Sequence, residues 1–212
     1  MKEFKYIIVE GLVKSFKTRL AEILAEEFNS RLILDNKDNP FLNEYYNSFA
    51  NTENSLPLKT QLIFLLNRYA QQLEISQKGL FHKTTVCDYI FFRDGIYAHL
   101  MLSDEDLEIY KNFFNIFSKS VVTPDLVIYL QISFAEMLKR INETGSKAEK
   151  NIPTEYWREV YEGYNYYFFN YKTSPMLVVN MEKVDLNNKS DTQHLIDEIK
   201  THKKGTRYYA PA

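Results

Sequence analysis

The stretch VEGLVKSFKTRLAEILAEEF, residues 9–28, decides how the rest of the chain is interpreted. It leads from an apolar segment through a glycine to Lys17 and Thr18, which open an amphipathic helix. This is the order of a phosphate-binding loop, in which backbone N–H groups and a helix N-terminus surround an anion. The pattern G-x-x-x-x-G-K-[ST] requires a glycine before the lysine, however, and Phe16 stands there. On this stretch alone, a plain turn before a helix is an equally good interpretation.

The composition indicates a soluble protein with one large domain. The chain has 212 residues and a formal net charge of −2, which gives no general attraction to nucleic acid. A single cysteine, Cys87, excludes an internal disulfide framework, and the four histidines show no metal-ligand spacing. The apolar run at the N-terminus is too short for a signal peptide or a membrane span. We therefore expect a cytoplasmic protein with no nucleic-acid or membrane partner.

Apolar runs alternate with amphipathic segments along the chain. Five strands are predicted, at residues 5–9, 31–34, 84–87, 125–132 and 176–180. Helices are predicted at 17–28 and 57–77, from residue 103, from 133 to 140, and at 191–200. The alternation predicts an α/β fold, in which helices flank a five-stranded parallel sheet.

In such sheets, ligands bind at the carboxyl ends of the strands. This edge would gather Glu10, Gly11, Asp35, Asp88 and the segment after Arg140.

Five further segments follow in a recognisable order: DNKDNPFLNEYYNSF (35–49), QLIFLLNRYAQQ (61–72), VCDYIFFRDGIYA (86–98), PDLVIYLQ (124–131) and RINETGSKAEKNI (140–152). Together they resemble the deoxyribonucleoside kinase family, in its bacterial deoxyadenosine/deoxyguanosine kinase-like branch, from Lys5 to about Asn180. A general P-loop nucleoside or nucleotide kinase is the nearest alternative. The resemblance implies a P-loop-kinase-like three-layer sandwich in one domain, residues 1–212, with a lid at about 140–152. It also implies a dimer formed through helices on one side.

The tail KKGTRYYAPA, residues 203–212, resembles the ends of some relatives. A loosely held terminus is at least as good an interpretation.

The resemblance implies roles for residues that would grip a deoxynucleoside. Asp35 matches the carboxylate that acts as base on the sugar 5′-hydroxyl, although glutamate is usual there. Tyr46 matches a tyrosine that meets the 3′-hydroxyl, and Glu149 matches a lid glutamate that helps it. Gln61 matches a glutamine that pairs with the base edge, a task suited to an amide that donates and accepts.

Each of these residues also has a structural interpretation. Gln61 and Arg68 are seven positions apart and share a helix face that could simply be solvated. Tyr46 could be an ordinary core residue. Asp88 could cap a helix, although the resemblance favours a catalytic place near the 5′-hydroxyl and the metal.

The other half of the implied site binds ATP. Gly11, Lys14, Lys17 and Thr18 belong to its loop, with Lys17 on the phosphates and Thr18 as a ligand of Mg²⁺ bound with ATP. Arg140 matches the lid cation and is counted with the catalytic residues.

The chain departs from the family pattern on this ATP side. Lys14 and Phe16 stand where the inner glycines belong. The helix after Asp88 should carry an arginine that reaches the phosphates, and the sequence there is Asp94-Gly95. Arg93, two positions earlier, would point roughly 200° away on a helix.

The lid pattern R-x-x-R-x-R is also incomplete. Arg140 is followed by no lid arginine, and Lys147 is the first later cation.

Two functional hypotheses follow. The first is an ATP-dependent deoxynucleoside 5′-kinase that is impaired on the ATP side. Loss of phosphate-binding arginines and cradle contacts would slow phosphoryl transfer about 10³–10⁴-fold or more. The second is a non-catalytic relative that binds nucleosides or pairs with an active kinase subunit, so that the oligomer is either a homodimer or a heterodimer.

Overall fold

A computed structural model describes residues 4–35, 38–48, 56–76 and 83–211. The described strands form one six-stranded sheet of order β2-β3-β1-β4-β5-β6, and every pairing is parallel. The strands are β1 (Tyr6–Gly11), β2 (Arg31–Ile33), β3 (Thr85–Cys87), β4 (Leu126–Gln131), β5 (Met176–Asn180) and β6 (Thr206–Tyr209). The predicted α/β fold with a helix-flanked parallel sheet is confirmed, and the predicted number of five strands is wrong.

The central strands owe their place to unbroken apolar runs. Every residue of β1 is buried, and in β4 only the last residue, Gln131, is exposed. Continuous burial on both faces is characteristic of parallel sheets covered by helices on both sides. These strands therefore form the centre of the hydrophobic core, and the loops that could bind a ligand follow their carboxyl ends.

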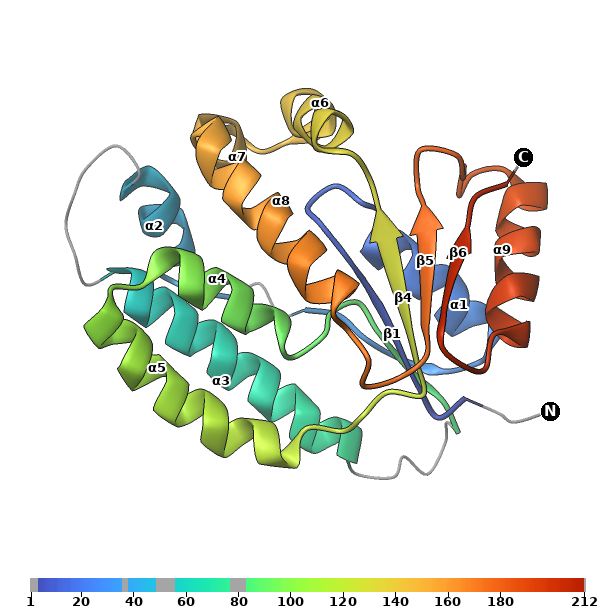
Figure 1. Cartoon of the computed structure of the whole chain (residues 1–212), viewed down its shortest axis with the longest axis horizontal. Coiled ribbons are helices and arrows are strands. Elements are labelled where there is room, and N and C mark those ends of the chain that lie inside the picture. Colours follow the sequence, from blue (N-terminus) through green and yellow to red (C-terminus); the bar gives the residue numbers. More distant parts are fainter. Residues whose placement is uncertain (1–3, 36–37, 49–55, 77–82, 212) are drawn as a thin grey trace.

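Helices cover both faces of the sheet (Figure 1). They are α1 (Lys17–Glu27), α2 (Leu42–Ser48), α3 (Leu56–Ser76), α4 (Arg93–Met101), α5 (Asp104–Phe117), α6 (Phe134–Thr144), α7 (Lys147–Asn151), α8 (Thr154–Phe169) and α9 (Lys189–Thr201), with a short 3₁₀ turn at Ser118–Ser120. The predicted helix at 57–77 corresponds to α3, and Gln77 lies outside the described residues.

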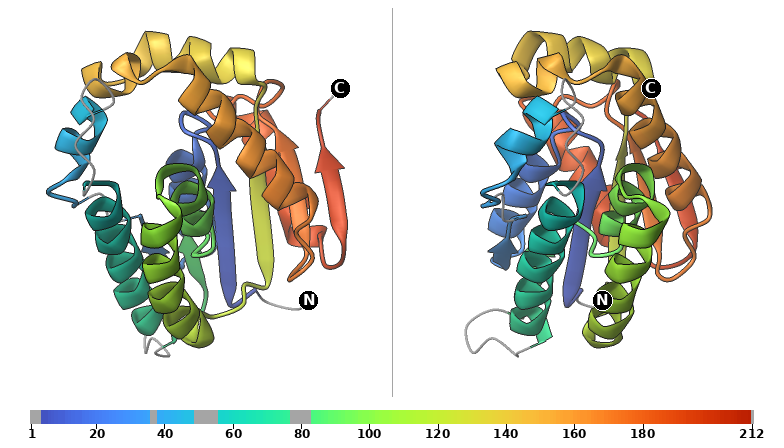
Figure 2. Two further views of the ribbon diagram at one scale, coloured as in Figure 1. Left: turned by 60° about the vertical axis from the view of Figure 1, so that its left-hand side comes forward. Right: turned by 90° about the vertical axis from the view of Figure 1, so that its left-hand side faces the viewer.

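Two contacts identify which helices share a face. On one side, Tyr129 of β4 stacks on Phe168 of α8 with ring centroids 4.1 Å apart. On the other side, an ion pair joins Lys200 of α9 to Glu27 of α1. Above the carboxyl ends of β1 and β4, helices α6 and α7 cross over the sheet, and α7 meets α2 (Figure 2).

Local sequence signals set several helix starts. Ser103 caps α5 by accepting a hydrogen bond from the Asp106 N–H at 3.2 Å. Ser133 caps α6 in the same way, from the Glu136 N–H at 3.2 Å. Both starts agree with the sequence-based prediction, because a serine side chain satisfies an N–H group that the first turn leaves open.

Helices α2, α7 and α8 and strand β6 have no counterpart in the sequence-based prediction. Helix α8 carries aromatic residues on both its buried and its exposed sides, which hides the usual apolar stripe. Strand β6 lies in the segment 203–212, where Met176 donates its N–H to the Gly205 carbonyl at 2.9 Å as the pairing with β5 begins. The alternative of a loosely held tail is therefore wrong for 206–209.

The turn into β6 provides a test of this strand. Gly205 has a φ of +65°, and an added Cβ would meet nothing within 4 Å, so only backbone strain opposes a side chain. Gly205→Ala is expected to lower the free energy of unfolding by about 1–2 kcal/mol, measured by urea denaturation.

Gly95→Ala is the matched control, because that position is equally open but helical. It is expected to raise the free energy of unfolding by about 0.5–1 kcal/mol. If Gly205→Ala leaves stability unchanged, the tail is not anchored as β6.

Candidate functional site

A cavity of about 1010 Å³ opens at the carboxyl ends of the strands. Residues from the β1–α1 loop, α2, α3, α4, α6 and α7 contribute to its wall. Nine of the ten residues predicted for the site line it: Lys14, Lys17, Thr18, Asp35, Tyr46, Gln61, Asp88, Arg140 and Glu149. The tenth, Gly11, ends β1 where the loop begins.

The loop between β1 and α1 keeps a tight bend without inner glycines. Lys14 and Phe16 both adopt left-handed backbone angles, with φ of 63° and 68°. This region usually requires glycine and costs other residues about 1–2 kcal/mol. At Gly11, an added Cβ would come within 2.5 Å of the Ser15 Oγ and 2.7 Å of the Leu130 carbonyl. The loop therefore needs its first glycine for close packing and bends at the other two positions despite their side chains.

Lys17 lies at the start of α1 and turns back over the loop. Its Nζ donates to the Gly11 carbonyl at 3.1 Å. Burial and the nearby Arg93 lower the pKa of Lys17 to about 8, against the opposing effect of Glu10 and other carboxylates. The ammonium group thus carries its charge at neutral pH with few competing protein contacts.

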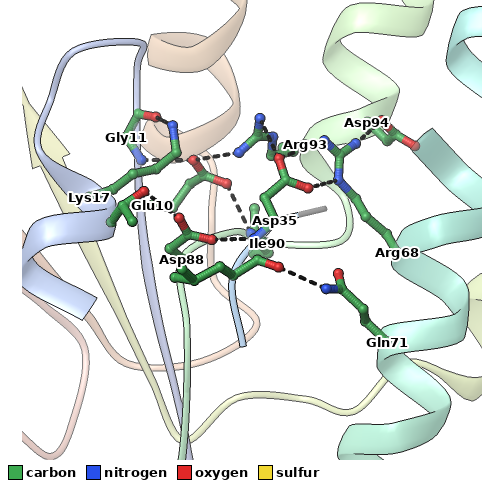
Figure 3. A network of polar contacts seen from close by, with 12 residues as sticks. Glu10, Gly11, Lys17, Asp35, Arg68, Gln71, Asp88, Ile90, Arg93 and Asp94 are labelled. Atoms are coloured by element: carbon green, nitrogen blue, oxygen red, sulfur yellow. Dashed lines mark hydrogen bonds and ion pairs between the residues drawn. The ribbon is translucent and has the colours of Figure 1, made fainter. Parts of the chain in front are cut away.

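Asp88 joins the loop side of the cavity to the end of β2. Its Oδ2 accepts from the Thr18 hydroxyl at 2.5 Å, and its Oδ1 accepts from the Asp35 N–H at 2.6 Å (Figure 3). Asp88 is not a helix cap, because α4 begins at Arg93 and its N-cap is Phe92. That structural alternative is wrong.

Asp35 is held by two arginines (Figure 3). Arg68 grips it with Nε at 3.0 Å from Oδ1 and Nη2 at 3.1 Å from Oδ2, and Arg93 Nη2 lies 3.2 Å from Oδ2. Burial alone would raise the pKa of Asp35, but Arg68 and Arg93 hold it well below its usual range. The carboxylate is therefore ionised across the physiological pH range.

Arg68 also forms an ion pair with Asp94 of α4, and both side chains are almost fully buried. Sequence reasoning did not assign a site role to either residue. The sequence signal for Arg68 is its seven-residue spacing from Gln61, which is also consistent with a solvated helix face. That alternative is wrong, because both Gln61 and Arg68 are only 3% exposed.

Gln61 has an unused acceptor. Its Nε2 donates weakly to the Met101 sulfur at 3.0 Å. Its Oε1 has no hydrogen-bond partner among the described residues. A buried amide oxygen without a partner costs free energy, so this group suits a bound polar ligand.

Tyr46 and Glu149 both line the cavity, but no hydrogen bond joins them in the described part of the chain. Burial raises the pKa of Tyr46, and the nearby charges of Tyr97 and Glu149 add to this effect. Glu149 instead pairs with Lys14 Nζ at 3.0 Å and accepts from the Ser146 N–H at 2.7 Å. Tyr46 is only half-buried, and it packs at the edge of the core rather than within it.

Arg140 ties the end of α6 to the loop. It donates to the Lys14 carbonyl at 3.1 Å and to the Met181 carbonyl at 3.2 Å, and it pairs with Glu136 at 2.7 Å. Its guanidinium also lies over the Phe16 ring, 4.6 Å from the centroid. Most of its donors are therefore engaged by protein.

Arg93 reaches the site, and the expectation that it would point away is wrong. The face of α4 that lines the cavity carries Arg93, Tyr97 and Met101 rather than Gly95, so the expectation referred to the wrong face of the helix. Its Nη1 lies 3.6 Å from Glu10, a fully buried carboxylate at the end of β1. Glu10 in turn accepts from the N–H groups of Gly11 at 2.8 Å and Ile90 at 2.9 Å.

Comparisons with known proteins agree on one family. A family model described as deoxynucleoside kinase matches residues 7–204. A deoxyguanosine kinase of Bacillus subtilis (strain 168) is 29% identical over 167 residues, covering 77% of this chain and 78% of the relative. A deoxyadenosine/deoxycytidine kinase of the same organism is 28% identical over 203 residues, covering 91% and 90%.

A solved structure shows the same fold. Deoxyadenosine kinase from M. mycoides, with dCMP and dCDP bound, superposes with a TM-score of 0.77 at 22% identity. The match covers 92% of this chain and 99% of that chain. No helix in the described part of the chain is long and apolar enough to cross a membrane.

Proposed function

The chain belongs to the deoxynucleoside kinase family, and on that premise we propose that it transfers the γ-phosphoryl group of ATP to the 5′-hydroxyl of a deoxynucleoside. ATP-dependent nucleoside phosphorylation is the activity that membership supports. The main support for this proposal is one observation. The ionised carboxylate of Asp35 and the loop ammonium of Lys17 line the same cavity.

The nucleoside would lie against α2, α3 and α4. Gln61 offers a buried amide whose Oε1 is unused, which suits the donor on a base edge. Arg68 and Asp94 lie on the same side of the cavity and hold each other in place. Tyr46 and Glu149, from α2 and α7, are the candidates for the sugar hydroxyl contacts.

Asp35 would orient the attacking hydroxyl and accept its proton. Its low pKa makes it a weak base, but phosphoryl transfer depends mainly on positioning and on charge stabilisation. Arg68 and Arg93 hold the carboxylate ionised, and the Asp88 contact fixes its backbone. Asp88 would thus help to align the hydroxyl with the phosphate loop.

The ATP phosphates would lie at the loop between Gly11 and Thr18, with Lys17 as their principal cation. Mg²⁺ usually takes one or two protein oxygens, with phosphate oxygens and waters completing the octahedron. Thr18 Oγ1 and Asp88 supply such a pair at the right edge. No group of three or more His, Cys, Asp or Glu side chains that could hold a metal ion occurs in the described ranges.

We propose that ATP binding is weaker than in a loop with inner glycines. Phe16 carries a ring where phosphate oxygens approach backbone N–H groups closely. Lys14 provides a cation near the loop, but its Nζ is paired with Glu149. Arg140 is the remaining lid arginine, and it contacts Lys14, Met181 and Glu136.

A second function is favoured by these same contacts. Two contacts join the lid segment to the β1–α1 loop without any ligand. They are the ion pair between Lys14 and Glu149 and the hydrogen bond from Arg140 to the Lys14 carbonyl. A protein that no longer binds ATP could keep such contacts permanently. It would then bind nucleosides without phosphorylating them, or pair with an active kinase subunit.

The decisive experiment combines turnover with ligand binding. With labelled ATP and Mg²⁺, we expect a 5′-monophosphate from at least one common deoxynucleoside. In thermal unfolding, each ligand at 100 times its Kd should add about 2.7 kcal/mol of stability. Lys17→Ala is expected to lose the response to ATP-Mg²⁺ and keep the response to the deoxynucleoside.

Lys172→Ala, at an exposed position before β5, is the control and should respond like the wild type. Stabilisation by a deoxynucleoside alone, with no product, would establish the non-catalytic alternative. No response to either ligand would contradict both functions.

The loop offers a direct test of impairment. Phe16→Gly removes the ring and places glycine at a φ of 68°, so we expect the affinity for ATP-Mg²⁺ to rise several-fold in calorimetric titration. Asn29→Gly is the control, because Asn29 also has a positive φ, of 44°, but follows α1 at its far end. An unchanged or weaker affinity in Phe16→Gly would show that Phe16 does not limit ATP binding.

We propose further that two copies pair through α3 and α5. These neighbouring helices expose five large apolar side chains, here called the α3–α5 face: Leu66, Leu73, Ile109, Phe113 and Ile116. The rings of Tyr69 and Phe117, stacked 4.2 Å apart, join the two helices beneath it. Exposed apolar side chains gathered on neighbouring helices favour an association site.

Sedimentation equilibrium should detect a dimer of the wild-type chain. Ile116→Glu, at a side chain 60% exposed on the α3–α5 face, is expected to give monomers because it would bury unpaired charge. Phe169→Glu alters a still more exposed apolar side chain, 81% exposed, on α8 and should remain dimeric. A wild-type monomer would contradict self-pairing and favour pairing with a related subunit.

A further inference from the structure

Arg93 is a buried cation with unused hydrogen-bond donors beside the reacting groups. We propose that Arg93 contacts the phosphoryl group during its transfer and stabilises the transition-state charge. This inference rests on the proposed function and assigns to the first residue of α4 a catalytic role that lay outside the sequence-based assignment.

The donors of Arg93 are only partly used. Its Nη2 pairs with Asp35 Oδ2 at 3.2 Å, while Nη1 has only the longer 3.6 Å ion pair with Glu10. Neither Nη1 nor Nε has a hydrogen-bond partner among the described residues, although the side chain is only about 10% exposed. Buried guanidinium donors are normally satisfied, so unpaired ones on a side chain that lines the cavity favour a ligand there.

Two other arginines of the cavity wall, Arg68 and Arg140, are committed to protein partners. Arg68 uses Nε, Nη1 and Nη2 on Asp35 and Asp94. Arg140 uses Nε, Nη1 and Nη2 on Glu136 and two carbonyls. Among the described arginines of the cavity wall that contact Asp35, Arg93 is thus the one with donors to spare.

Arg93 also lies on the path of the reaction. It contacts Asp35, which would receive the hydroxyl proton, and its charge acts on Lys17, which would hold the outer phosphates. The phosphoryl group must cross the space between these two residues. A guanidinium there can donate to the equatorial oxygens, on which negative charge accumulates.

The step is a simple displacement. The 5′-hydroxyl oxygen forms a bond to the γ-phosphorus, and the bond from that phosphorus to the β–γ bridging oxygen breaks. The hydroxyl proton passes to Asp35, and ADP leaves with the bridging oxygen. Glu10 would hold Arg93 in place, because Glu10 is itself fixed by the N–H groups of Gly11 and Ile90.

Turnover of Arg93 variants tests the proposal. Arg93→Gln is expected to lower kcat about 10²–10⁴-fold while the KM for the deoxynucleoside changes only a few-fold. Arg93→Lys keeps the positive charge but loses the planar guanidinium that can donate two hydrogen bonds side by side, and kcat should fall about 10-fold. Arg207→Gln, an exposed arginine on β6, is the control.

A binding measurement separates this proposal from catalysis as a whole. The wild type should bind the 5′-monophosphate more tightly than the matching deoxynucleoside, because Arg93 reaches the phosphate. Arg93→Gln should reduce this preference about 10- to 100-fold, and Arg93→Lys several-fold. If Arg93→Gln does not fold, Arg93→Lys decides alone.

The outcomes are distinct. If both folded Arg93 variants keep the wild-type turnover and the wild-type preference for the monophosphate over the deoxynucleoside, the inference is overturned. The proposed kinase activity would still stand. Loss of the preference without any wild-type turnover would support the phosphate contact while contradicting catalysis. A wild type that binds the monophosphate no better than the nucleoside would overturn the phosphate contact.

Discussion

The carboxylate of Asp35 joins elements that are far apart in the sequence. It pairs with Arg68 of α3 and Arg93 of α4, while its own N–H donates to Asp88 after β3. Desolvating charges costs several kcal/mol per ion unless geometry and further hydrogen bonds compensate. The positions of α3, α4 and the ends of β2 and β3 are therefore mutually constrained. The same contacts that hold these elements together also set the charge of the cavity.

The fold was predictable where local pattern and final environment agree. Buried strands such as β1 and β4 appear as unbroken apolar runs, and the serine caps at Ser103 and Ser133 mark real helix starts. Strand β6 escaped prediction because its Thr206–Tyr209 segment is short and mostly exposed, and its pairing with β5 is a long-range property. Helix α8 escaped because its aromatic residues mask a single apolar stripe.

The candidate site was predictable in location and only partly in contacts. Strand ends and motif order indicated which residues share the cavity. Ion pairs such as Arg68 with Asp94 were not visible, because a charged residue in a helix looks the same in sequence whether it is buried or solvated. The position of Arg93 was misjudged because the sequence does not show which face of α4 meets the cavity, and that face carries Arg93 and Tyr97 rather than Gly95.

The bend of the β1–α1 loop has an entropic consequence. Lys14 and Phe16 take left-handed angles that the unfolded chain rarely visits at such residues, and the Arg140 guanidinium lies over the Phe16 ring. A glycine loop loses more backbone freedom on ordering than a loop of larger residues. This loop is thus already ordered before any anion arrives, and less ordering entropy remains to be lost on binding. Reduced access to the backbone N–H groups of the loop weakens anion binding, whereas the smaller ordering cost strengthens it.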